Sequence, residues 1–137
     1  MPLDPARVEE TRSWLVKADE DLRAAKVDLQ ADPPLVGDAL FHCQQAVEKA
    51  EKGFLSWHDK PFRKTHNLVE LGIQCAEADE AVEPLLRRAA KLSAHATEFR
   101  YPGMAAAPVL EEASDALDTA TAVVAEIRKR LPADVSP

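Results

Sequence analysis

The residues best suited to chemistry lie in the segment 39–52, which reads ALFHCQQAVEKAEK. On a helix with about 3.6 residues per turn, His42, Gln45 and Lys49 fall along one edge, roughly one turn apart. An imidazole, a carboxamide and an ammonium group offer hydrogen-bond donors and a positive charge, which suit a phosphate, a nucleobase edge or the carboxylates of a partner chain. In the alternative interpretation, Gln45 and Lys49 are solvated and His42 binds a carbonyl of a neighbouring loop.

Two further groups could contact an anion. Lys64 and His66 flank Thr65, which is placed to cap a helix, and the free amides and positive dipole end of a helix start favour anions. The alternative there is a plain threonine cap followed by exposed polar residues. Arg100 lies near the end of another expected helix, where it could clamp a phosphate or cap the last carbonyls.

The elements that must position these residues are helices. The ten prolines lie mainly between segments of helical periodicity, so they predict about five helices. Asp4 and Pro5 suit the cap and the first position of the first helix. Because short connections favour antiparallel neighbours, we expect an all-α, up-and-down antiparallel bundle. The expected helical segments are 4–31, 35–57, 65–76, 83–101 and 108–131.

The second expected helix has two faces. Its apolar residues share one stripe, which must face the core. The polar edge lies on a different face, so we expect the row of histidine, glutamine and lysine to turn toward something outside the monomer. The stripe consists of Leu40, Cys43, Val47, Ala50, Phe54 and Trp57.

Length and composition predict one helical domain, residues 1–132, followed by a frayed tail, 133–137. The chain has 137 residues, 46% of them hydrophobic and 30% charged, with only 4 glycines. No run of 18 apolar residues and no secretory signal is visible, which predicts a cytoplasmic protein without a membrane segment. Cys43 and Cys75 lack the spacing of a disulfide framework or a zinc site, so we expect reduced, buried thiols, no metal and no cofactor.

Charge and motifs exclude several functions. A net charge of −7 disfavours a protein that coats nucleic acid nonspecifically, although residues 49–66 are locally positive. A solvated basic loop would explain that segment equally well. No HExxH motif, glycine-rich phosphate loop or dinucleotide fingerprint is present, and Ser93 and Thr97 have no recognisable triad partners. Hydrolase and kinase chemistry therefore has no sequence support.

Three motifs in order resemble the HEPN domain family over roughly residues 10–130. They are Phe41-His42-x-Gln44-Gln45-Ala46-x-Glu48-Lys49, then Lys64-Thr65-His66-x-Leu68, and then Arg100-Tyr101-Pro102. The resemblance implies a bundle of about five helices, usually a homodimer, in a family named for nucleotide binding. Many single-domain members resemble the C-terminal domain of aminoglycoside nucleotidyltransferases and are paired with a separate minimal nucleotidyltransferase chain, whereas others are ribonuclease toxins.

Our preferred interpretation is a HEPN-type module that binds a nucleotide or substrate. It would be dimeric, would partner a separate nucleotidyltransferase in a toxin–antitoxin-like pair and would lack transferase chemistry of its own. A groove for the anionic ligand or for the partner would be lined by His42, Gln45, Lys49, Lys64, His66 and Arg100.

The main alternative is a metal-independent ribonuclease toxin. That branch of the family uses an Arg and a His separated by four to six residues on one helix, usually brought together with their copies across a dimer interface. Here Arg88 and His95 would lie on nearly the same side of the fourth helix. His95 would act as general acid or base and Arg88 would stabilise phosphate charge. Ala89 and Thr97 stand where the toxin pattern commonly has a polar residue and a tyrosine. A third interpretation is a non-catalytic dimeric interaction protein whose polar stripe is an interface.

Overall fold

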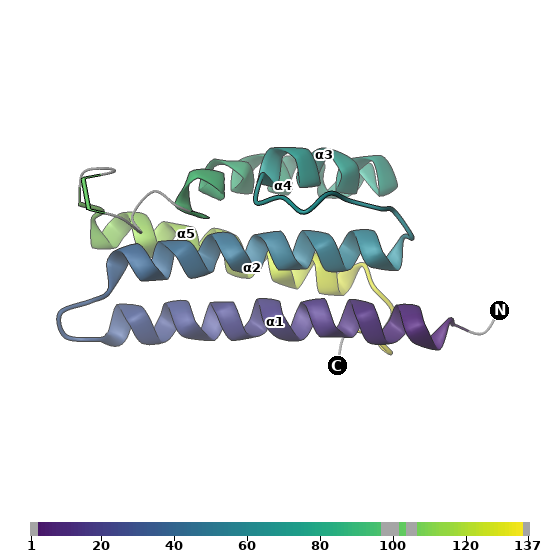
Figure 1. Cartoon of the computed structure of the whole chain (residues 1–137), viewed down its shortest axis with the longest axis horizontal. Helices are drawn as coiled ribbons and strands as arrows, with labels where there is room; N and C mark the ends of the chain where they lie inside the picture. Colours follow the sequence, from purple (N-terminus) through teal and green to yellow (C-terminus); the bar gives the residue numbers. More distant parts are fainter. Residues whose placement is uncertain (1–2, 97–101, 104–106, 136–137) are drawn as a thin grey trace.

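The computed structural model describes residues 3–96, 102–103 and 107–135, and within these ranges it contains helices and no strand. The all-α prediction is therefore confirmed. The α-helices are α1 (Pro5–Gln30), α2 (Val36–Trp57), α3 (Leu68–Ala78), α4 (Glu83–Ala89) and α5 (Leu110–Lys129) (Figure 1). Two 3₁₀ segments, η1 (Glu80–Val82) and η2 (Ala90–Ala96), flank α4.

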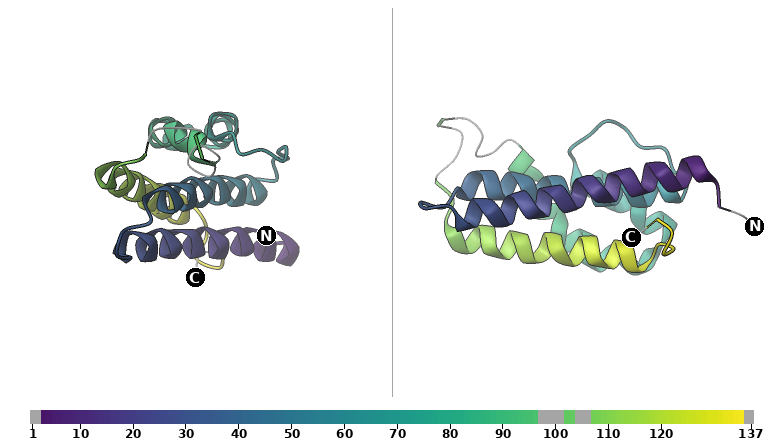
Figure 2. Two further views of the ribbon diagram at one scale, coloured as in Figure 1. Left: turned by 60° about the vertical axis from the view of Figure 1, so that its left-hand side comes forward. Right: turned by 90° about the horizontal axis from the view of Figure 1, so that it is seen from below.

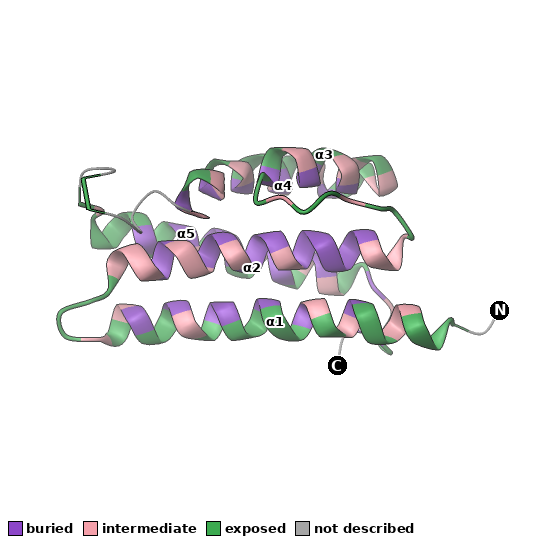
Figure 3. Cartoon of the chain, viewed as in Figure 1, coloured by how far each residue is buried: buried purple, intermediate pink, exposed green. Residues whose placement is uncertain are grey.

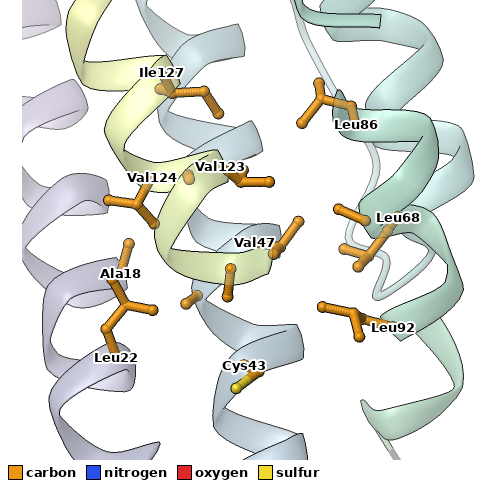
Figure 4. Packing of buried hydrophobic residues seen from close by; sticks show 14 of the residues in the cluster. Ala18, Leu22, Cys43, Val47, Leu68, Leu86, Leu92, Val123, Val124 and Ile127 are labelled. Carbon is orange, nitrogen blue, oxygen red and sulfur yellow. The ribbon is translucent and has the colours of Figure 1, made fainter. Parts of the chain in front are cut away.

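Helix α2 is the centre of the bundle. It packs against α1 and α5 and also against α3 and η2, so that α1 lies on one side of it and the α3–α4 pair on the other (Figure 1, Figure 2). Its predicted apolar stripe is buried from Leu40 to Phe54, and Figure 3 shows how little of its second half is exposed. Figure 4 shows Cys43 and Val47 of α2 among core side chains from the other helices.

The direction of α3 differs from the expectation. The Gln44 side chain lies 3.1 Å from the His66 carbonyl, and the Cys75 thiol lies 3.5 Å from the Glu51 carbonyl, so α2 and α3 run parallel. The prediction that all neighbours are antiparallel is wrong for this pair, because the connection 58–67 returns along α2 before α3 begins (Figure 1). Helices α1 and α2 are antiparallel as expected, with Asp21 beside Lys49 and Glu10 beside Ser56.

Two helix starts were predicted with caps. At α1 the Asp4 carboxylate accepts a hydrogen bond from the Ala6 amide at 3.0 Å, as expected. At α3 the predicted Thr65 cap is wrong, because the helix begins at Leu68 and the Asn67 side chain caps it. The Thr65 hydroxyl instead accepts a hydrogen bond from the Asn67 amide, which forms a turn ahead of the helix.

The fourth helix also differs from the prediction, and the chain after α5 packs against α1. The α-helix ends at Ala89, and the chain continues as a 3₁₀ helix to Ala96. Residues 97–101 lie outside the described residues. Residues 133–135 of the expected tail are described by the structure. Val135 is buried, its amide donates to the Pro132 carbonyl, and Arg12 donates to the Asp134 carbonyl, so this end of the chain packs beside α1.

Both cysteines are buried and free of disulfides, as expected. Burial, together with the nearby carboxylates Asp21 and Asp28, raises the pKa of the Cys43 thiol to about 12. Burial and the charge of Glu51 raise the pKa of Cys75 as well. Neither thiol is a reactive nucleophile near neutral pH, because the thiolate is the reactive form. None of the described helices combines the length and the apolar character needed to cross a bilayer.

Candidate functional site

Two of the three residues in the predicted polar row meet on a carboxylate of the neighbouring helix. His42 Nδ1 lies 2.8 Å from Asp21 Oδ1, and Lys49 Nζ lies 2.6 Å from Asp21 Oδ2. Asp21 is buried on α1, whereas His42 and Lys49 are partly exposed. His42 and Lys49 therefore face α1, whereas the row was expected to turn outward. A buried carboxylate such as Asp21 is stable only when cations and donors satisfy it.

Gln45 belongs to a second group. Its Nε2 donates to Gln44 Oε1 at 2.7 Å and to Glu48 Oε1 at 3.4 Å. Gln44 and Glu48 lie one turn apart on the more buried side of α2. The structure thus divides the predicted row between an Asp21 cluster (Asp21, His42 and Lys49) and a Glu48 cluster (Gln44, Gln45, Glu48, Lys52 and His66).

Glu48 is the acceptor at the centre of its cluster. His66 Nδ1 lies 2.7 Å from Oε1, and Lys52 Nζ donates to Oε2 at 3.0 Å. Gln44 Nε2 also donates to Oε1, at 3.1 Å. Burial by itself would raise the pKa of Glu48, but these hydrogen bonds and the charge of Lys52 hold that pKa below its ordinary value. Glu48 is consequently an anion inside the fold.

His66 is held in place from two elements while its ring stays open to solvent. Its side chain is 67% exposed although Nδ1 contacts Glu48. Its backbone carbonyl accepts hydrogen bonds from Gln44 Nε2 and from the Ser93 hydroxyl of η2, both at 3.1 Å. Such fixation lowers the conformational entropy that His66 would lose on contacting a ligand.

The connection that carries His66 is also fixed at its middle. Phe62 packs edge-on against Trp14 of α1, with ring centroids 6.1 Å apart. The Lys52 ammonium lies 5.7 Å from the Trp14 ring centroid and 5.8 Å from that of Phe62. These cation–π contacts and the Glu48 ion pair compensate the charge of the buried Lys52.

The start of α3 does not offer free amides to an anion. The Leu68 amide donates to the Ser93 hydroxyl at 2.9 Å, and the amides of Val69 and Glu70 donate to the Asn67 side chain. Lys64 lies exposed in the connection before the helix. An anion near Lys64 and His66 would therefore rely on their side chains. Arg100, the sixth residue predicted to bind the ligand, lies outside the described residues.

The outer face of the α3–α4 pair is apolar. Val69 and Ile73 are 51% and 58% exposed, and they stand one turn apart on α3, where they form what we call the α3 ridge. A groove of about 590 Å³ lies on one side of this ridge, and a second groove, bordered by Pro61, Phe62 and Gln74, lies on the other. The first groove is lined mainly by Leu68, Val69, Gly72, Ile73, Leu86 and Ala90.

Arg88 and His95 are placed differently from the ribonuclease expectation. Arg88 is exposed on α4, whereas His95 is 8% exposed in η2 and lines a cavity of about 370 Å³ that Arg88 does not line. Arg88 belongs to α4 and His95 to η2, so the two residues do not share one α-helix. Because η2 has about three residues per turn, His95 does not lie on the same side as Arg88, as it would on a continuous α-helix. Glu112, Asp115 and Lys91 also line this cavity, so two carboxylates and one ammonium group surround His95 there.

Several residues of these clusters were not predicted from the sequence. Gln44, Glu48 and Lys52 repeat every four residues, which places them on one line of α2. Asp21 and Asp28 directly precede Leu22 and Leu29, so both aspartates lie at the edge of the apolar stripe of α1. Charged residues at such positions indicate a buried polar contact. Ser93 has no comparable signal, since its partners lie far away in the sequence.

Comparisons with known proteins give one match. A family model described as HEPN domain matches residues 11–130 of the chain. A search of curated proteins and a search of solved structures each gave no significant match. The family match covers all the described helices except the first residues of α1.

Proposed function

The chain belongs to the HEPN domain family, and on this premise we propose that it acts as a dimeric binding module that partners a separate minimal nucleotidyltransferase chain. The observation that carries the proposal is the exposed α3 ridge between two grooves. Contiguous exposed apolar surface of this kind marks interaction sites. The resemblance of the motifs to single-domain family members supports the nucleotidyltransferase as the further partner.

A second copy of this chain fits the α3 face because the face is self-complementary. In a two-fold dimer, the Val69–Ile73 ridge of each protomer would enter a groove beside the ridge of the other. Charges of both signs stand beside the grooves, in the pairs Arg63–Glu70 and Arg87–Glu83. Since each pair contains both signs, a two-fold arrangement can place a cation of one protomer near an anion of its partner.

Light scattering coupled to size-exclusion chromatography tests the dimer. We expect the mass of a dimer for the wild type and of a monomer for Ile73→Asp, because a carboxylate at the centre of an apolar interface would be desolvated. Val27→Asp is the matched control, since Val27 is also 58% exposed but lies on α1. A monomeric wild type, or dissociation by both variants, would contradict the α3 interface.

The ligand in this proposal is an anionic nucleotide bound beside His66 and Lys64. His66 supports it because its ring is exposed while its Nδ1 and its carbonyl are fixed, and Lys64 adds an exposed ammonium two residues away. His42 and Lys49 contribute less, because Asp21 already occupies both. We propose that the nucleotide phosphates contact the imidazole edge and the Lys64 ammonium.

Isothermal titration with ATP, GTP and their diphosphates, in the presence and absence of the nucleotidyltransferase chain, tests the ligand. We expect the double variant Lys64→Ala, His66→Gln to bind about tenfold or more weakly, consistent with the loss of two charge-assisted contacts. Lys26→Ala on α1 removes the same charge from a different face and should bind as the wild type does. Absence of heat with every nucleotide would rule out the ligand but not the dimer.

The ribonuclease interpretation has less support. It requires Arg88 and His95 to act together on a phosphate, but His95 is buried beside two carboxylates and Arg88 is exposed elsewhere. We expect neither the wild type nor His95→Gln to cleave RNA in a cleavage assay. Cleavage by the wild type that His95→Gln abolishes would favour the toxin over the binding module.

A further inference from the structure

Asp28, Asp38 and His42 come together where α1 ends and α2 begins. One ligating atom from each residue, a carboxylate oxygen or an imidazole nitrogen, lies within 4.8 Å of the other two. Asp38 and His42 stand one turn apart on α2, with Asp38 Oδ2 3.4 Å from His42 Nε2. Asp28 reaches the same point from the last turn of α1, so the cluster connects the two helices.

The imidazole is already oriented for coordination. His42 Nδ1 contacts Asp21 Oδ1 at 2.8 Å, and the other oxygen of Asp21 is bonded to Lys49. Because Asp21 engages Nδ1, Nε2 is the ring nitrogen that faces Asp38 and is left for a metal ion. A carboxylate behind a histidine is the usual arrangement around metal-binding imidazoles, because it fixes the tautomer and the ring.

Asp28 supplies a second and independent indication. Its side chain is 8% exposed, and its Oδ2 has no hydrogen-bond partner within the described part of the chain. A buried carboxylate oxygen without a partner is costly. Asp38 adds to this cost, because burial and then the hydrogen bond to Asp38 and the charge of Asp38 raise the pKa of Asp28 to about 6.

We propose that Asp28, Asp38 and His42 bind one divalent transition-metal ion, with Asp21 as the positioning residue behind His42. One imidazole and two carboxylates suit Mn²⁺, Co²⁺ or Zn²⁺ better than Mg²⁺ or Ca²⁺, which prefer oxygen ligands alone. Bond lengths of about 2.0–2.2 Å would draw the three ligating atoms closer together than the separations of up to 4.8 Å at which they now stand. Solvent can complete the coordination, since Asp38 and His42 are partly exposed. The ion would join the end of α1 to the start of α2.

The test uses the full chain after removal of metals with a chelator. We expect Zn²⁺ to bind with one ion per chain in isothermal titration and to raise the melting temperature by several degrees. Co²⁺ should give visible absorption bands that saturate at the same ratio. Asp38→Asn should weaken Zn²⁺ binding by about tenfold or more, as loss of a ligand predicts. Asp32→Asn makes the same charge change in the exposed connection and should leave the affinity unchanged.

Asp38→His keeps the assay informative if Asp38→Asn folds poorly. It replaces an oxygen ligand by a nitrogen ligand, so it should retain one Zn²⁺ per chain and shift the Co²⁺ bands. The proposal is overturned if neither metal saturates on the wild type, or if Asp32→Asn and Asp38→Asn weaken binding equally. It is also overturned if nitrogen-15 spectra at saturating Zn²⁺ show both ring protons still on His42, since His42 would then be an imidazolium bonded to Asp21 and Asp38.

Discussion

Two carboxyl groups three residues apart on α2 have opposite surroundings. Glu48 is surrounded by donors, which keep it ionised. Glu51 is completely buried, and neither of its side-chain oxygens has a hydrogen-bond partner in the described part of the chain. Burial, and secondarily the charge of Glu48, raise the pKa of Glu51 well above its ordinary value. Glu51 is therefore neutral over a range of pH in which an exposed glutamate is ionised.

Replacement of Glu51 by glutamine should change how stability depends on pH. Because its folded-state pKa is raised above 4.5, the Glu51 contribution is fully present below about pH 4.5 and is lost as the pH rises toward the folded-state pKa. Glutamine does not ionise, so the melting temperature of Glu51→Gln should rise relative to that of the wild type as the pH increases. The corresponding gain in the free energy of unfolding is roughly 1.4 kcal/mol per pH unit within that window.

Thermal denaturation between about pH 4 and pH 8 measures this difference. Glu9→Gln, at an exposed position of α1, is the control and should follow the wild type at each pH. A constant difference between Glu51→Gln and the wild type across this range would show that Glu51 has an ordinary pKa.

At the scale of elements, the start of α3 depends on Asn67. Its side chain accepts from the amides of Val69 and Glu70, and Ser93 of η2 accepts from the amide of Leu68. The parallel course of α3 along α2 further depends on the bonds from Gln44 and Ser93 to the His66 carbonyl. A few side-chain contacts thus set where the helix begins and where His66 is presented.

Asn67→Ala should lower the free energy of unfolding by about 1 kcal/mol, the usual cost of losing a cap. Asn67→Asp should retain most of the stability, because a carboxylate also accepts from these amides and interacts favourably with the helix dipole. Urea denaturation monitored by circular dichroism gives the values. Thr65→Ala should cost less than Asn67→Ala, and the reverse order would restore Thr65 as the cap.

At the scale of the molecule, the two faces of the bundle differ. The α1 face contributes Asp21 and Trp14 to the buried polar and aromatic contacts, and the α3–α4 face presents the α3 ridge between its grooves. If the chain dimerises through the α3 face, His66 can bind a ligand only when it lies at the edge of that interface. In the proposed function, dimerisation and ligand binding would therefore use neighbouring surfaces of the molecule.

If the α3 ridge forms a dimer, thermal stability should depend on protein concentration. The melting temperature of the wild type should rise by several degrees over an increase of about a hundredfold, because association stabilises the folded state by mass action. That of Ile73→Asp should stay constant. Differential scanning fluorimetry over this range measures both, and equal behaviour of the two proteins would argue against association through this face.

The helices and the core could be predicted from the sequence, because periodicity and proline positions are local signals. The stripe from Leu40 to Phe54 is buried as predicted, and α1 begins at its predicted cap. The direction of α3 was not predictable in this way, since it depends on contacts of Gln44 and Ser93 with a carbonyl far away in the sequence. The same reason explains why the 3₁₀ turns of η2 differ from the expectation.

The polar row on α2 shows which features followed from the sequence and which followed from the tertiary structure. The sequence alone determined that His42, Gln45 and Lys49 share one edge of a helix, because the helical repeat follows from local backbone geometry. Only the tertiary structure decided that His42 and Lys49 meet Asp21 of α1 and that Asp28 of α1 approaches Asp38 of α2. Those partners come from other helices or other turns, and their positions depend on how the helices pack around a buried charge, which no local pattern records.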